Sequence, residues 1–209
     1  MKDVGCVMLA AGSSTRMDSW KMLLPWGGST IVEQSVKTAL SVCSRLILVV
    51  GFRARELTEL FRKRLEVEVV VNADFASGMF SSVRQGAEAA AEGPFFLALA
   101  DMPGVSGGVY RNLLHWGRRL DGGFAAAGTA YAVIPQYRGK KGHPLLLSAG
   151  IRARILRADA SETLRDVLAG VPTAVVPVDE PGILHDIDTP ADYRSWGPAG
   201  PAGPAGGAR

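Results

Sequence analysis

Short apolar runs and longer amphipathic stretches alternate along this chain. Near-continuous apolar runs are typical of strands that are buried on both faces of a parallel sheet. The apolar runs predict strands at residues 4–9, 45–51, 67–71, 95–100, 124–127, 130–134, 144–147 and 173–178. The run at 144–147 is short, and we expect it at the edge of a mixed sheet.

Apolar positions three and four residues apart indicate helices. Thr30 and Glu33 form a capping-box pattern before one such stretch, and Thr189 with Pro190 and Asp192 marks the start of another. The spacing predicts helices after residue 30, at 54–65, 81–91, 109–120 and 161–168, and after residue 189. Strands that alternate with amphipathic helices predict an α/β fold, with a Rossmann-like, doubly wound, mostly parallel (mixed) sheet in a single domain.

The chain of 209 residues is long enough for one well-buried domain and short for two. We expect this domain to span residues 1–196. Residues 197–209 read GPAGPAGPAGGAR and offer no side chains that could bury area. We expect a disordered Gly/Pro/Ala tail there.

Composition and charge exclude several classes of protein. The net charge is +3 and the cations are scattered through the predicted helices, so we expect no nucleic-acid partner. No apolar run approaches the length of a membrane span. Cys6 and Cys43 lack the spacing of metal ligands, which predicts buried thiols in a reducing cytosol. Lys2 and the apolar residues 4–11 resemble a signal peptide, but the apolar core is short and Asp3 is misplaced, so we expect a cytoplasmic protein.

The first candidate for chemistry is the loop that follows the first predicted strand. Small residues there let backbone N–H groups approach an anion closely, and Arg16 and Lys21 then supply positive charge. A loop of Ala, Gly and Ser after a strand is common without a ligand, so the two cations carry the hypothesis of a polyphosphate site. The candidate nucleotide-binding residues of the loop are Leu9, Ala10, Ala11, Gly12, Ser13 and Ser14.

Three carboxylates are candidate metal ligands. Asp101 follows the strand at 95–100, at the edge of the sheet where α/β proteins bind ligands. Asp186 and Asp188 would share one face of a strand. Mg²⁺ is held by one or two carboxylates together with substrate phosphates, which this set fits. The alternatives are that Asp101 caps a helix, although Ser106 is the better cap, and that Asp188 caps the helix at residue 189.

Two polar segments are candidates for contacts with substrates. In the segment 72–82, Asn72, Gly78, Ser81 and Ser82 are candidate nucleotide-binding residues, although either serine could simply cap the following helix. The basic loop 138–143 is either a solvated loop or a mobile clamp for an acidic second substrate. Its candidate substrate-binding residues are Lys140, Lys141, Gly142 and His143. We assign His115 and His185 structural roles.

Five motifs in order resemble the molybdenum cofactor cytidylyltransferase branch of the MobA-like nucleotidyltransferases. They are LAAGSSTRM with Lys21, NADFASGMFSSV, LADMP, GHP and DIDTPADY, and the resemblance spans residues 4–196. It implies that residues 9–14 hold the nucleotide, that Arg16 and Lys21 bind its phosphates, that residues 72–82 face the nucleoside, and that Asp101 and Asp186 hold Mg²⁺.

Two positions bear on how closely this chain follows that family. Asp18 stands where the family usually has Gly. Ala11 stands where relatives that transfer guanylate have a second Gly, which favours a pyrimidine nucleotide.

The resemblance implies a Mg²⁺-dependent transfer of CMP from CTP to a phosphorylated pterin, the molybdenum cofactor, with release of pyrophosphate. Arg16, Lys21 and Asp101 are then the candidate catalytic residues, and a molybdoenzyme acceptor is a conceivable partner. One alternative is an NAD(P)H-dependent oxidoreductase of the same fold, such as the related nicotine blue oxidoreductase, with NADPH as cofactor. Another is a carrier that binds the pterin without turnover.

Overall fold

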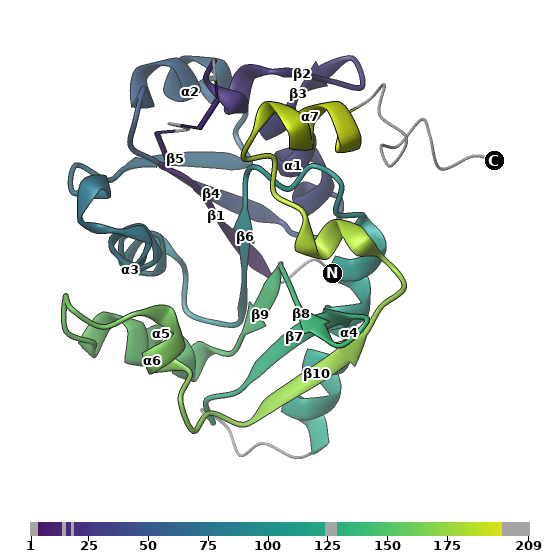
Figure 1. Ribbon diagram of the computed structural model, residues 1–209. Coiled ribbons are helices and arrows are strands. Elements are labelled where there is room, and N and C mark those ends of the chain that lie inside the picture. The colour runs from purple at the N-terminus through teal and green to yellow at the C-terminus, as the bar shows by residue number, and fades with distance from the viewer. Residues whose placement is uncertain (1–3, 14–15, 18, 124–128, 198–209) are drawn as a thin grey trace.

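The computed structural model describes residues 4–13, 16–17, 19–123 and 129–197 (Figure 1). Ser14, Asp18, the predicted strand at 124–127 and residues 198–209 lie outside the described residues. The predictions made for them, including the disordered tail, stay predictions.

A central sheet of eight strands organises the described residues (Figure 1). Its strands are β1 (Gly5–Ala10), β4 (Arg45–Val50), β5 (Val67–Val71), β6 (Phe95–Leu99), β7 (Ala132–Tyr137), β8 (Lys140–Lys141), β9 (Leu145–Leu147) and β10 (Thr173–Pro177). Their order is β10-β7-β9-β6-β1-β4-β5, with β8 paired to β7. β1 pairs in parallel with both β4 and β6, while β9 is antiparallel to both of its neighbours. The α/β class and the mixed, doubly wound sheet are therefore confirmed.

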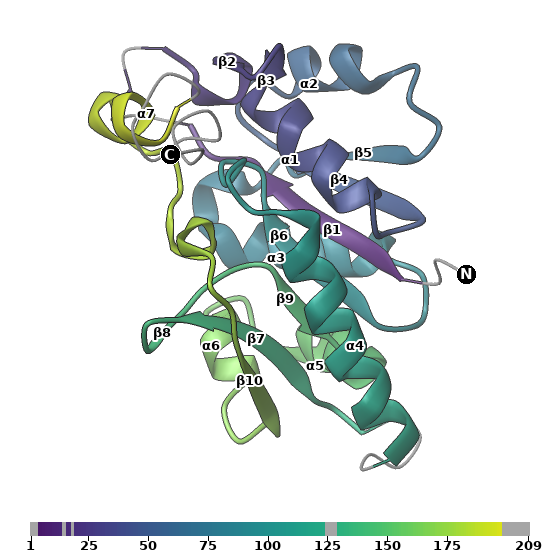
Figure 2. The ribbon, with the colours of Figure 1, turned by 90° about the vertical axis from the view of Figure 1, so that its right-hand side faces the viewer.

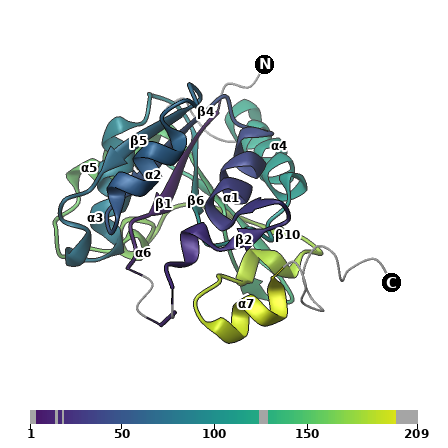
Figure 3. The same ribbon diagram turned by 90° about the horizontal axis from the view of Figure 1, so that it is seen from above.

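Helices cover both faces of the sheet, as the views in Figures 2 and 3 show: α1 and α4 lie on one side, and α3 and α5 on the other. The helices are α1 (Ile31–Leu40), α2 (Ala54–Phe61), α3 (Met79–Ala89), α4 (Gly107–Gly123), α5 (Ala149–Arg157), α6 (Leu164–Val167) and α7 (Pro190–Trp196). None of the described helices is long and apolar enough to cross a membrane.

Side chains that alternate along β1 pack into two separate hydrophobic clusters, one on each face of the sheet. Cys6 and Met8 join the cluster beneath α1 and α4, and Val7 and Leu9 join the cluster beneath α3 and α5. Burial of a side chain such as Met8 contributes about 1.5–3 kcal/mol. Cys6 and Cys43 are both buried free thiols, as expected. Burial, and then the hydrogen bond with Cys43, raises the pKa of Cys6.

The expectation that residues 144–147 form an edge strand is wrong. β9 lies between β6 and β7, and β5 and β10 form the edges of the sheet. The chain reverses after β7 through the short strand β8 and returns as β9, which inserts antiparallel between its neighbours. All three leucines of β9 are buried, as an interior position requires.

Helix boundaries differ from the predicted ones at several places. α2 ends at Phe61, and Leu65, expected on its apolar face, is 97% exposed in the turn before β5. α3 begins at Met79, two residues earlier than expected, because Gly78 adopts φ 118° and serves as its N-cap. α5 was not predicted, although Ile151 and Ile155 share one buried face at a spacing of four residues.

A short hairpin early in the chain contacts the last helix, α7. The strands β2 (Pro25–Trp26) and β3 (Ser29–Thr30) form a hairpin, and α7 lies beside it (Figures 1 and 3). The Tyr193 hydroxyl donates a hydrogen bond to the carbonyl of Pro25 over 2.6 Å. The predicted capping boxes at Thr30 and Thr189 are both present. This contact places the segment that precedes α7 beside the loop that follows β1.

Candidate functional site

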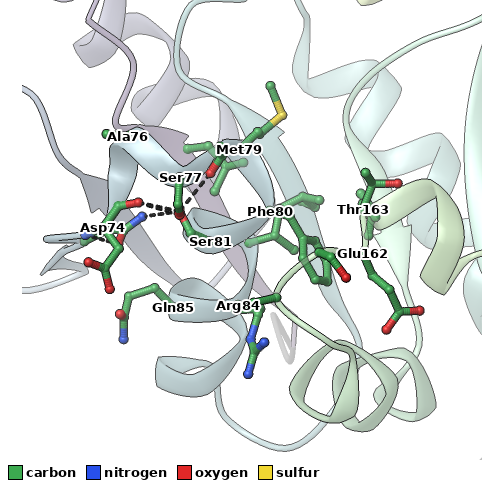
Figure 4. Close-up of a pocket in the computed structure, with 18 of the residues that line it drawn as sticks. Asp74, Ala76, Ser77, Met79, Phe80, Ser81, Arg84, Gln85, Glu162 and Thr163 are labelled. Carbon is green, nitrogen blue, oxygen red and sulfur yellow. Dashed lines mark hydrogen bonds between the residues drawn. The ribbon is translucent and has the colours of Figure 1, made fainter.

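Two adjoining cavities open at the carboxyl ends of β1 and β6. The smaller has a volume of about 350 Å³ and the larger, shown in Figure 4, about 1020 Å³. Leu9, Met79 and Leu99 line both, so the two form one continuous surface. This is the edge at which open α/β sheets bind their ligands.

The smaller cavity brings together most of the charged residues singled out from the sequence. The loop after β1 contributes Ala11, Gly12 and Ser13 to its wall. The remaining predicted residues around it are Arg16, Lys21, Ser82, Asp101, Asp186 and Asp188. Small residues, two cations and three carboxylates therefore surround one space. Phe75 and Met22 also line it and were not singled out from the sequence.

Lys21 occupies the centre of this charged group. It is only 5% exposed, and its Nζ lies 2.6 Å from Asp101 Oδ2 and 2.5 Å from Asp188 Oδ1. Burial alone would lower the pKa of Lys21, but the charges and hydrogen bonds of Asp101 and Asp188 outweigh it and raise the pKa. Arg16, whose side chain is 69% exposed, donates to the other oxygen of Asp188.

The three carboxylates are close enough to share a cation. One oxygen from each of Asp101, Asp186 and Asp188 lies within 4.8 Å of the others. Asp101 Oδ1 is buried and has no hydrogen-bond partner in the described part of the chain, so an acceptor atom is left for a ligand. A set of carboxylate oxygens is the donor chemistry of Mg²⁺ or Mn²⁺, and the residues present fit such an ion.

The carboxylates differ in their electrostatic surroundings. Burial, and then the charge of Asp188, raises the pKa of Asp186. Burial acts in the same direction on Asp188, but the hydrogen bond and charge of Lys21, with the charge of Arg16, lower its pKa. Asp188 therefore keeps its negative charge to lower pH than Asp186 does.

The segment that carries Asp186 and Asp188 is not a strand, which corrects the sequence-based expectation. It is an irregular extended segment after the 3₁₀ helix η3 (Pro181–Leu184). Ile187 still turns into the protein, with 1% exposure, and its N–H donates to the carbonyl of Asp101 over 2.9 Å. The suggestion that Asp188 caps the next helix is also wrong, because Thr189 is the N-cap of α7.

Contacts between loops fix the two acidic segments relative to each other. Glu180, just before η3, accepts hydrogen bonds from the N–H and the hydroxyl of Ser106 over 2.5 and 2.6 Å. Gly182 lies against Gly104 so closely that a Cβ on Gly182 would come within 2.5 Å of the Gly104 carbonyl oxygen. No local sequence pattern predicts this contact. Ser106 also accepts from the N–H of Gly108 at the start of α4, in agreement with its expected capping role.

The polar segment 72–82 is held by internal hydrogen bonds. Asn72 is 2% exposed, and its Nδ2 donates to the hydroxyls of Ser81 and Ser82 over 2.8 and 3.0 Å. Its Oδ1 accepts from the N–H of Asp74 over 3.0 Å. Both amide hydrogens are therefore used within the protein. Since Gly78 is the N-cap of α3, Ser81 and Ser82 lie in its first turn and do not cap it. Asn72 therefore shapes the loop at the cavity, and its role in binding the nucleotide stays a prediction.

The larger cavity adds residues that the sequence reasoning missed. Its wall opposite α3 comes from the segment before and within α6, including Glu162, Thr163 and Arg165 (Figure 4). Arg84 reaches across from α3 and donates to the carbonyl of Ala158 over 2.9 Å. The helix predicted at 161–168 is shorter than expected, because α6 begins at Leu164 with Thr163 as its N-cap. Its proximity to α3 is a product of the fold.

The predicted substrate-binding residues of the 138–143 loop separate in the structure. His143 lines the larger cavity, and burial lowers its pKa, partly opposed by the charge of Asp186. Lys140 and Lys141 are exposed on β8 and line neither cavity. Gly142 packs against η3, where a Cβ would meet the Ile183 carbonyl oxygen at 2.1 Å. A substrate role for these last three residues stays a prediction.

The sequence of this chain matches a family of NTP transferases. Residues 6–181 match the family model of the MobA-like NTP transferase domain. The chain is 34% identical over 193 residues to molybdenum cofactor cytidylyltransferase of Escherichia coli (strain K12), covering 92% of this chain and 95% of that protein. It is 35% identical over 163 residues to nicotine blue oxidoreductase of Paenarthrobacter nicotinovorans, covering 73% of this chain and 76% of that protein.

A solved structure supports the same fold. A nucleotidyl transferase from Methanothermobacter thermautotroptrophicus superimposes with a TM-score of 0.75 at 26% identity, over 91% of this chain and 94% of that one.

Proposed function

Because this chain belongs to the MobA-like NTP transferase family and is a nucleotidyltransferase, we propose that it transfers CMP from CTP to a phosphorylated pterin, the molybdenum cofactor, and releases pyrophosphate. The observation that carries the proposal is the smaller cavity, in which a loop of small residues faces two cations and three carboxylates. The named cytidylyltransferase relative supplies the choice of nucleotide and acceptor.

In this proposal one group of residues binds the polyphosphate and a second group holds the metal ion that stabilises its charge. The backbone N–H groups of residues 11–13 and the cations Arg16 and Lys21 bind the polyphosphate and neutralise the departing pyrophosphate. Asp101, Asp186 and Asp188 would hold Mg²⁺, which supplies positive charge at the phosphates when it is bound.

The acceptor needs no general base from the protein. Its nucleophile is a phosphate monoester with a second pKa near ~6, so it is mostly ionised at neutral pH. The protein's task is to hold that oxygen in line with the phosphorus under attack. We assign the acceptor to the larger cavity, between α3 and α6, beside His143. The nucleoside then lies along the rim that Gly78, Ser81 and Ser82 form between the cavities.

A panel of ligands tests the binding half of the proposal. A ligand that binds only the native state raises the melting temperature by mass action. CTP, GTP, ATP, NADPH and NADH would each be compared with and without Mg²⁺. The proposal predicts the largest increase for CTP with Mg²⁺. If GTP or ATP raised the melting temperature as much as CTP or more, the choice of CTP as the nucleotide would be contradicted.

The same panel decides between this function and the second candidate. The identity to nicotine blue oxidoreductase favours an oxidoreductase that uses NADPH. That function predicts a rise with NADPH that does not depend on Mg²⁺, together with loss of NADPH absorbance when a quinonoid acceptor is added. A molybdoenzyme that receives the finished cofactor, in the cytoplasm, is the partner that the main proposal implies.

Replacing Arg16 with Ala is expected to weaken nucleotide binding by roughly 10–100-fold, because hydrogen bonds to charged groups contribute about 1.5–3 kcal/mol. The fold should remain, since the side chain is 69% exposed and its ion pair with Asp188 is worth at most about 1 kcal/mol. Calorimetric titration with CTP and Mg²⁺ measures the first effect and thermal melting the second. Arg45→Ala is the matched control, because Arg45 is 64% exposed and pairs with Glu68. Equal effects of both variants on CTP affinity would remove Arg16 from the site.

Replacing Ala11 with Gly is expected to relax the preference for CTP over GTP, chiefly by admitting GTP. Ala11 is 8% exposed and lines the smaller cavity. The prediction assumes that its methyl group limits the space left for a purine. Overpacking by one methyl group costs about 1–3 kcal/mol, or roughly one to two decades in affinity. The ratio of kcat/KM for the two nucleotides measures the change. An unaltered ratio would show that Ala11 does not select the base.

A further inference from the structure

The ammonium group of Lys21 lies where a cation bound by the carboxylates would have to compete with it. It hydrogen-bonds to Asp101 and to Asp188, which are two of the three candidate metal ligands. It is nearly buried, so water screens its charge poorly. Asp101 Oδ1 is open to a divalent cation, but Lys21 and Arg16 occupy the two oxygens of Asp188. A cation shared by these two carboxylates would therefore lie close to the Lys21 ammonium, and the two positive charges would repel each other strongly.

Lys21 also lies beside the place assigned to the polyphosphate. It lines the same cavity as Gly12 and Ser13, and it begins the short 3₁₀ helix η1 (Lys21–Leu23) directly after the loop. Its side chain is a compact charge on a flexible four-carbon stem, so its end can turn between neighbouring anions without backbone movement. Phosphate oxygens in this cavity would offer it a second set of partners.

We propose that Lys21 acts as an internal counter-ion that competes with a divalent cation for Asp101 and Asp188, and that a polyphosphate in the same cavity relieves this competition by drawing the ammonium away. The inference rests on the proposed function for the identity of the polyphosphate. It makes binding of cation and nucleotide mutually dependent: each raises the affinity of the other by the same factor. The cation alone binds weakly because it must displace Lys21.

The direct test is titration of Mn²⁺ alone into the full-length protein, with bound and free Mn²⁺ distinguished by electron paramagnetic resonance. Lys21→Met removes the competing charge and keeps much of the side-chain volume. We expect it to bind Mn²⁺ more tightly than wild type by about tenfold or more, within the usual range of coupling between sites. Lys37→Met is the matched control, because Lys37 is exposed on α1 and lines neither cavity. It should bind Mn²⁺ as wild type does.

A second titration adds CTP without acceptor. CTP should raise the Mn²⁺ affinity of wild type by a clearly larger factor than that of Lys21→Met. Lys21→Gln serves as a second variant, with circular dichroism as the check on folding. If the folded variants bind Mn²⁺ no more tightly than wild type, or if CTP raises their affinity by the same factor as it does for wild type, the competition does not exist.

Failure of this inference and failure of the proposed function give different results. In one case Lys21→Met binds Mn²⁺ alone more tightly while the wild-type protein releases no pyrophosphate from any nucleotide. That result would support the counter-ion role of Lys21 and contradict the proposed cytidylyltransferase activity. Release of pyrophosphate from CTP, with no gain in Mn²⁺ affinity when Lys21 is replaced, would contradict the counter-ion role of Lys21 and support the proposed enzymatic activity.

Discussion

Replacing Asp101 with Asn is expected to lower turnover by roughly 10²–10³-fold, the usual loss when a group that stabilises transition-state charge is removed. The side chain keeps its shape but loses its charge, and its amide would place donor hydrogens against the Lys21 ammonium, 2.6 Å from the present Oδ2. The buried Oδ1, which has no partner in the described part of the chain, would no longer belong to a carboxylate that can hold Mg²⁺.

Pyrophosphate release at increasing Mg²⁺ concentrations measures this effect. The response of the wild type to Mg²⁺ should be lost in the variant. Its melting temperature should also fall, because the nearly buried Lys21 then keeps only Asp188 as a carboxylate partner. Asp179→Asn is the control, because Asp179 is exposed and lines neither cavity. Undiminished turnover of Asp101→Asn at limiting Mg²⁺ would rule out a metal role for this carboxylate.

Replacing Gly182 with Ala is expected to reduce both stability and turnover. The added Cβ would lie 2.5 Å from the carbonyl oxygen of Gly104, a backbone atom that cannot turn away. Overpacking of this kind costs about 1–3 kcal/mol. The segment that bears Asp186 and Asp188 must then move relative to Asp101, and a misplacement of about 1 Å can cost roughly 10²-fold in rate.

The control lies on the other side of the same contact. A Cβ on Gly104 would meet only the Cα of Gly182 at 3.9 Å, which is ordinary van der Waals contact, so Gly104→Ala should behave almost as wild type. Urea unfolding and steady-state pyrophosphate release measure the two effects. A Gly182→Ala protein with wild-type turnover would show that the spacing of the carboxylates does not depend on this contact.

The parts of the fold that depend on local pattern were predictable. β1, β4 and β6 are continuous apolar runs, and the capping boxes at Thr30 and Thr189 stand at true helix starts. β9 was misplaced because an apolar run of three leucines does not reveal which strands will flank it. α3 begins earlier than predicted because Gly78 adopts φ 118° and serves as its N-cap, a backbone conformation that helical periodicity does not reveal.

The predicted cations and carboxylates meet at one cavity, although their roles stay predictions, and the contacts between them could not be predicted from the sequence. Loop position alone singled out Lys21 and Asp101, 80 residues apart in sequence. That they form an ion pair follows from the packing of the segment 185–188 over both of them, which no local pattern encodes. Asn72 shows the converse, because its polar character suggested a ligand while its hydrogen bonds are made within the protein.

Release of pyrophosphate from CTP decides whether this protein is a cytidylyltransferase. Purified protein would be incubated with Mg²⁺ and molybdopterin together with either CTP or GTP, and pyrophosphate would be measured over time. We expect release with CTP that requires both Mg²⁺ and the pterin, that is much slower with GTP, and that is lost in Asp101→Asn. No release from CTP under these conditions, or faster release from GTP, would contradict it.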